Sequence, residues 1–236
     1  MTLPKIEYPT FELTVPSTKQ KIRHRPYFVK EEKLLLMAQQ SGNINEIITA
    51  MKQVIVNCVV SDGFNVNKLM TFDVEYIFLK LRAISVNNVI NLTYLDNEDQ
   101  KKYTVQLNLD EVEVKFDSEH TNRIQLSEDM ILQLRYPGLE LDEKIINAPD
   151  VSTSFFEMVK FCLDKLMIQD EMFLFSEYSD QQKEEFLNSL TPSSFDKIKK
   201  FFETMPKLSH TVSYTNSLGH EQKIVLETLN DFFTLA

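Results

Sequence analysis

Hydrophobic positions between residues 30 and 83 follow helical spacing. In residues 44–58, seven apolar side chains recur at steps of three and four, which places them on one stripe of an α-helix. Residues 71–83 differ because apolar side chains surround the whole helix, so we expect this helix at the centre of an N-terminal core. Another helix is predicted at residues 30–40, ending at Gly42, where glycine can adopt a left-handed conformation.

The apolar period changes to two on both sides of these helices. Residues 11–15 alternate, and residues 19–25 return after a turn at Pro16, which predicts an N-terminal β-hairpin. Short alternating runs separated by tight turns follow the central helix and predict a small antiparallel meander. These runs lie at residues 90–94, 103–109, 112–116, 124–126 and 131–136.

The last third of the chain is mainly helical and closes with a hairpin near residues 211–226. Residues 138–150 contain Pro149 and several carboxylates and predict a linker between an N-terminal domain, residues 1–137, and a C-terminal domain, residues 151–236. We therefore expect an α+β fold. It combines an N-terminal β-hairpin, helices around a central buried helix, an antiparallel meander, and a mainly helical C-terminal part that ends in a β-hairpin.

Composition and charge narrow the class of protein. The chain has 236 residues, 43% hydrophobic and 25% charged, which is ordinary for a globular protein. Its formal net charge of −10 argues against general nucleic-acid binding. No apolar run follows a basic start, and no stretch approaches the ~20 apolar residues of a membrane span. We therefore expect a cytosolic, soluble protein.

Motifs that carry chemistry are nearly absent. The four glycines are isolated, so no phosphate-binding loop is indicated. Cys58 and Cys162 lie in helical apolar patterns and are expected to be buried free thiols. His210 and His220 could face each other across the last hairpin, but two ligands do not complete a zinc site. We expect no catalytic residues, metal, cofactor or small-molecule substrate.

A basic strand face is the first candidate partner-binding surface. Lys19, Lys21, Arg23 and Arg25 share one face of the returning strand, because strand side chains alternate with a period of two. One interpretation is a solvated edge strand protected from aggregation by its charges. The other is an acidic protein partner, with a nucleic-acid backbone as a more distant alternative.

Phenylalanines concentrated in the last third are the second candidate. Phe201 and Phe202 are adjacent, as are Phe232 and Phe233, and neighbouring side chains cannot both point to one core. One member of each pair is expected in a groove or in an interface with another chain; the alternative is a second face packed within the same domain. Phe201, Phe232 and Phe233 are the residues selected as candidates.

Taken in order, the residues resemble the baseplate hub subunit family of contractile-tailed phages of the T-even type. The resemblance covers essentially the whole chain, and it rests on residues 25–38, 72–82, 108–114, 205–210 and 231–233. Some relatives carry a cysteine pair at the tip of the last hairpin that would suit zinc. Residues 215–219 contain no cysteine, so this departure removes the zinc expectation here.

The resemblance implies a non-enzymatic protein of tail assembly, made in the host cytoplasm and contacting other hub or tail proteins. Two roles stay open: a structural subunit retained in the tail baseplate, or a chaperone-like factor that binds hub proteins transiently and leaves. A third class, an enzyme such as a tail-associated wall hydrolase, has no better candidate than ordinary carboxylate pairs such as Glu184 and Glu185.

Overall fold

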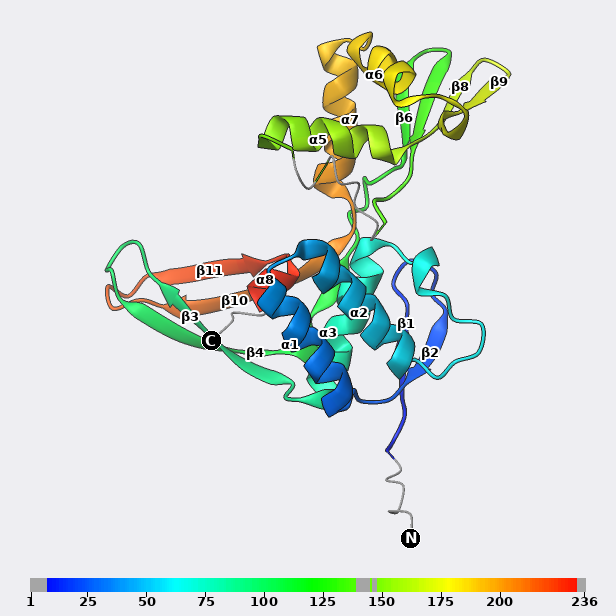
Figure 1. Ribbon diagram of the computed structural model, residues 1–236. Helices are drawn as coiled ribbons and strands as arrows, with labels where there is room; N and C mark the ends of the chain where they lie inside the picture. Colours follow the sequence, from blue (N-terminus) through cyan, green and yellow to red (C-terminus); the bar gives the residue numbers. More distant parts are fainter. Residues whose placement is uncertain (1–7, 139–144, 146–147, 233–236) are drawn as a thin grey trace. The chain divides into compact units, whose positions relative to one another are not determined.

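Helices and small antiparallel sheets are both present, which confirms the predicted α+β class (Figure 1). The computed structural model describes residues 8–138, 145 and 148–232. Contacts divide the chain into two compact units. Unit 1 contains the residues up to Lys115 and those from Lys207 onward, and unit 2 contains residues Phe116 to Pro206.

The last hairpin explains why these units differ from the sequence-based domains of residues 1–137 and 151–236. Strand β10 (Lys207–Thr215) pairs with β5 (Glu113–Lys115), so the chain after residue 206 packs in the unit that holds the N-terminal helices. Local periodicity does not encode a pairing between strands this far apart in the sequence. Much of the expected linker at residues 138–150 lies outside the described residues, and its linker role remains a prediction.

Three helices near the N-terminus form one side of unit 1. They are α1 (Val29–Ser41), α2 (Ile44–Cys58) and α3 (Thr71–Ser85). The α1 helix ends at Gly42, whose φ of 65° is the predicted left-handed cap. Most of α3 is buried, as its all-round apolar pattern predicts. At the start of α3, whose first helical residue is Thr71, the Asp73 carboxylate accepts the Met70 N–H at 3.1 Å.

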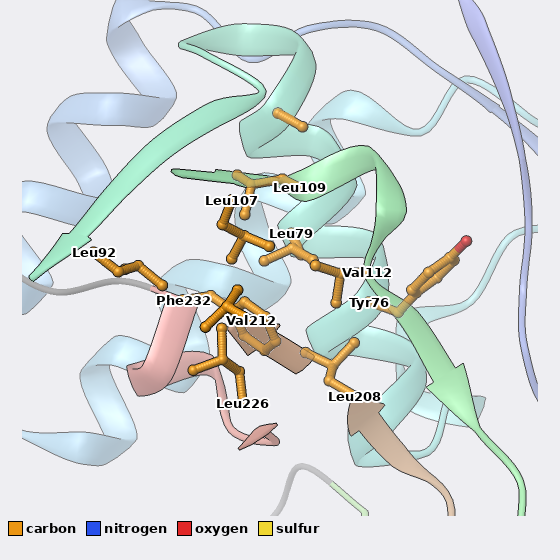
Figure 2. Packing of buried hydrophobic residues seen from close by; sticks show 11 residues of the cluster. Tyr76, Leu79, Leu92, Leu107, Leu109, Val112, Leu208, Val212, Leu226 and Phe232 are labelled. Atoms are coloured by element: carbon orange, nitrogen blue, oxygen red, sulfur yellow. The ribbon is translucent and has the colours of Figure 1, made fainter. Parts of the chain in front are cut away.

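Two long hairpins complete the core of unit 1. The first joins β3 (Val89–Leu95) to β4 (Lys102–Asn108), and the second joins β10 to β11 (Glu221–Leu226). The short helix α8 (Leu229–Phe232) follows β11. Side chains from α3, both hairpins and α8 meet in one cluster (Figure 2). Its buried members include Tyr76, Leu79, Leu92, Leu107, Leu109, Val112, Leu208, Val212, Leu226 and Phe232.

The expected meander exists as strands but not as one sheet. The predicted runs correspond to β3, β4, β5, β6 (Arg123–Ser127) and β7 (Met130–Leu134). However, β3 pairs only with β4 among the described strands, β5 pairs with β10, and β6 and β7 belong to a four-stranded sheet with later strands. Strand pattern fixes which residues alternate, whereas the partner of each strand depends on tertiary packing.

Unit 2 packs helices against this four-stranded sheet, whose order is β6-β7-β8-β9. Its later strands are β8 (Leu163–Ile168) and β9 (Glu171–Leu174), and its helices include α5 (Val151–Cys162), α6 (Asp180–Asn188) and α7 (Pro192–Thr204). The sequence predicts one helical stripe from Phe155 through Leu166, but α5 ends at Cys162. Leu163 and Leu166 enter β8 and join the core there, because pairing with β7 outweighs local helix propensity.

None of the helices in the described parts of the chain is long and apolar enough to cross a membrane.

Candidate partner-binding surfaces

Strand β2 (Lys21–His24) brings two of the four predicted basic residues together. Its burial alternates: Lys21 and Arg23 are exposed, whereas Ile22 and His24 are buried. Ile22 is 0% exposed, so it anchors the strand and fixes which face the charged residues occupy. We call the exposed face formed by Lys21 and Arg23 the basic strand face.

A carboxylate on the neighbouring strand reduces the charge of this face. β1 (Phe11–Thr14) pairs with β2 so that Glu12 lies opposite Arg23. The Lys21 ammonium donates a hydrogen bond to the Glu12 carboxylate at 2.7 Å, and this bond raises the pKa of Lys21. The repulsion expected between like charges is therefore partly offset, and both groups are highly exposed.

β2 belongs to a two-stranded sheet with β1, and residues after α2 lie along part of its other side. The Arg23 N–H donates to the Ser61 hydroxyl at 2.7 Å, and the Val60 N–H donates to the Arg23 carbonyl at 2.8 Å. β2 therefore lies between β1 and this segment. Both interpretations of its charges, a solvated edge strand and an acidic protein partner, stay predictions.

Arg25 does not share the basic strand face, because its side chain turns inward and holds the start of α1. Its guanidinium donates to the buried Glu31 carboxylate at 3.1 Å and to the Asn57 carbonyl at 2.9 Å. The guanidinium carbon also lies 4.1 Å from the centre of the Phe28 ring. Arg25 is therefore a structural residue that ties α1 to α2.

Lys19 lies in the β1–β2 turn rather than in the strand. Its φ of 58° is in the left-handed region, and its N–H donates to the Val15 carbonyl at 2.9 Å. The same turn is fixed to α3 because the Ser17 N–H donates to the Asp73 carboxylate at 2.8 Å. Lys19 is exposed near the basic strand face, but strand alternation does not position it.

The selected phenylalanines are interior residues where the structure describes them. Phe201 is 2% exposed and Phe232 is 1% exposed, so neither side chain is available on the surface of its unit. Phe201 stacks with Tyr136 at a centroid distance of 5.6 Å, and Phe202 packs edge-on against Phe201. This arrangement corresponds to the alternative of a second packed face within the same unit. Phe233 lies outside the described residues.

The expected apposition of the two late histidines is wrong. His210 lies opposite Leu226 in the hairpin, whereas His220 lies in the turn and its Nδ1 is 3.0 Å from the Glu98 carboxylate. The part of the chain described by the structure contains no group of three His, Cys, Asp or Glu residues that could hold a metal ion.

A polar network joins the tips of the two long hairpins of unit 1, and sequence reasoning missed it. The Asn216 amide donates to Glu98 at 2.7 Å, and the Ser217 hydroxyl donates to Asp99 at 2.7 Å. Hydrogen bonds from His220 and then from Asn216 lower the pKa of Glu98. The two turns lie far apart in the sequence, so their contact could not be predicted from it. The only signal was that each turn is rich in polar residues.

Both cysteines are free and buried, as predicted from their apolar patterns. Burial raises the pKa of Cys58 to about 11, although the nearby Arg25 opposes this shift. Burial raises the pKa of Cys162 to about 12. A thiol with such a pKa remains protonated at neutral pH and is a poor nucleophile, so both act as small core residues.

A family model described as T4 bacteriophage base plate protein matches residues 8–234. No curated protein and no solved structure matches the chain significantly. Because the family model covers both units, this chain belongs to the family of T4-type bacteriophage base plate proteins.

Proposed function

We propose that this chain is a non-enzymatic baseplate hub protein that takes part in tail assembly through protein–protein contacts. The family match over residues 8–234 is the observation that carries the proposal. The described cysteines and the Arg25–Glu31 pair serve packing and local structure, which also favours a binding role. The protein would be made in the host cytoplasm and, if retained, would lie in the tail baseplate.

A chaperone-like assembly factor is the alternative role within the same family. The exposed Lys21 and Arg23 would suit transient contact with an acidic hub protein as well as permanent contact. The two roles differ in whether the chain stays in the mature particle. In both, the partners are other baseplate or tail proteins, with no nucleic acid, cofactor or small-molecule substrate.

Reversing the basic strand face should weaken binding to baseplate hub proteins while leaving the fold intact. The double variant Lys21→Glu/Arg23→Glu is expected to reduce affinity roughly tenfold or more, because like charges then oppose an acidic partner. Its thermal transition should change little, since the Lys21–Glu12 pair is exposed to solvent and an exposed ion pair adds little stability. Affinity is measured by titration with purified hub proteins of the same phage.

The matched control is Lys102→Glu/Lys223→Glu, which changes the net charge equally at exposed positions elsewhere in unit 1. This control should bind like the wild type. Equal affinity of the basic-face variant and the wild type would exclude the basic strand face from the interface. Equal weakening of both double variants would show an effect of net charge alone.

A further inference from the structure

Helix α1 has apolar side chains on the face that points away from its own unit. Val29 is 79% exposed, Leu36 is 51% exposed and Met37 is 60% exposed. With Lys33 they occupy positions i, i+4, i+7 and i+8, which is the spacing of one continuous helix face. We call these four residues the outer face of α1.

The opposite side of α1 contributes little apolar packing to unit 1. Only Glu31 and Ala38 are buried, and they are seven residues apart on a single stripe. In Figure 1, α1 (dark blue) lies beside α2, against which it packs. A surface helix normally turns its large apolar residues inward and its polar residues outward. On α1, Leu35 and Ala38 lie on the inner side, but three large apolar residues lie outward as well, which is typical of a helix that another protein covers.

The outer face is held rigidly enough to serve as a preformed surface. At the start of α1, the Phe28 N–H donates to the Glu31 carboxylate at 2.8 Å and Arg25 holds the same carboxylate. At its end, the Gly42 N–H donates to the Gln39 carbonyl at 3.1 Å. A binding surface that is already ordered loses less conformational entropy when a partner docks.

The charged residues of α1 indicate which kind of partner would fit the outer face. Lys33 is exposed in the middle of the outer face, and among the described residues no carboxylate pairs with it. A second copy packed symmetrically on this face would bring two Lys33 side chains together, and these like charges would repel each other. An apolar segment flanked by Asp or Glu would cover the apolar side chains and also pair with Lys33.

We propose that the outer face of α1 docks an amphipathic acidic segment of another baseplate or tail protein. This inference rests on the proposed function, and it names the partner chemistry at a surface that the basic strand face does not include. Glu32 lies one turn before Leu36 on one flank, whereas the Lys30 ammonium on the other flank lies 3.5 Å from the Glu31 carboxylate. The acidic residues of the partner are therefore expected to lie over Lys33, away from Glu32.

The test places a photo-reactive benzoylphenylalanine at position 36 in the full chain expressed in infected cells. Mass spectrometry then identifies the cross-linked peptide. The expected product joins position 36 to a tail-protein segment that contains both apolar and acidic residues. Benzoylphenylalanine at Leu218, an exposed apolar residue of the last hairpin, is the matched control and should not give this product. Products from a copy of this chain only, or from no tail protein, would overturn the proposal.

Charge variants supply the second arm of the test. Lys33→Glu should reduce the cross-link yield at position 36 roughly tenfold, whereas Lys33→Arg should retain it. Equal yields for both variants would overturn the acidic assignment. Copurification of tail proteins with the unmodified chain distinguishes a failure of the α1 proposal from a failure of the proposed function. If tail proteins copurify but position 36 gives no cross-link, only the α1 proposal fails. If the unmodified chain recovers no tail protein, the proposed function fails as well.

Discussion

The Glu31→Gln variant is expected to lose about 3–5 kcal/mol of unfolding free energy, because removing one partner of a buried ion pair leaves the other charge uncompensated. The Glu31 side chain is 0% exposed and that of Arg25 is 17% exposed. Glutamine keeps the shape of the side chain and can still accept the Phe28 N–H. The loss therefore reports the carboxylate charge, and chemical denaturation at neutral pH measures it.

Glu32→Gln is the matched control, because Glu32 is the exposed neighbour of Glu31 on the same helix. We expect it to change the unfolding free energy by no more than about 0.5 kcal/mol. A loss in Glu32→Gln as large as the loss in Glu31→Gln would mean that both carboxylates act through the helix as a whole rather than through Arg25.

The contribution of Glu31 to the unfolding free energy should also depend on pH. Burial raises its pKa, but the Phe28 N–H and then Arg25 outweigh burial, so the net pKa lies below the ordinary value of 4.5. The stabilisation by the carboxylate is therefore fully present above about pH 4.5 and is lost as the pH falls through the lower folded-state value. The gap between wild type and Glu31→Gln should narrow in acid, and a gap that stays constant would contradict this origin.

Replacing Phe232 by alanine is expected to destabilise unit 1 by about 3–5 kcal/mol. Phe232 is 1% exposed and lies in the cluster that joins α3 to both long hairpins (Figure 2). Its removal leaves a cavity between residues before 115 and residues after 207. Amide hydrogen exchange should therefore become faster in β3 and β4, whereas unit 2 should keep its protection.

Leu218→Ala is the control for Phe232→Ala, because Leu218 is 58% exposed in the same unit. It should change the stability by no more than about 0.5 kcal/mol. Faster exchange in β8 and α7, with unchanged exchange in β3 and β4, would contradict the assignment of the C-terminal residues to unit 1.

Elements set by local pattern could be predicted from the sequence. The all-round apolar residues of α3 predicted its burial, because no polar face was available to meet water. Gly42 predicted the end of α1, since a left-handed residue stops a helix. The alternating runs predicted β3 and β4 within one or two residues of their observed bounds.

Features set by long-range contacts could not be predicted in this way. Alternation placed Arg25 beside Arg23, but the strand ends at His24 and the guanidinium turns to a carboxylate six residues later. The pairing of β5 with β10 changes the division of the chain, and no local signal encodes it. Adjacent phenylalanines indicated two packing directions, and the structure shows that Phe201 and Phe202 both pack within unit 2.

The most direct measurement is quantitative mass spectrometry of purified mature particles beside the infected-cell lysate. The proposed role as a baseplate hub protein predicts this chain in the particles at a fixed, integer ratio to the other tail proteins. Abundance in the lysate together with absence from the particles would contradict that role, and it would make the chain an assembly factor that dissociates before the tail is complete.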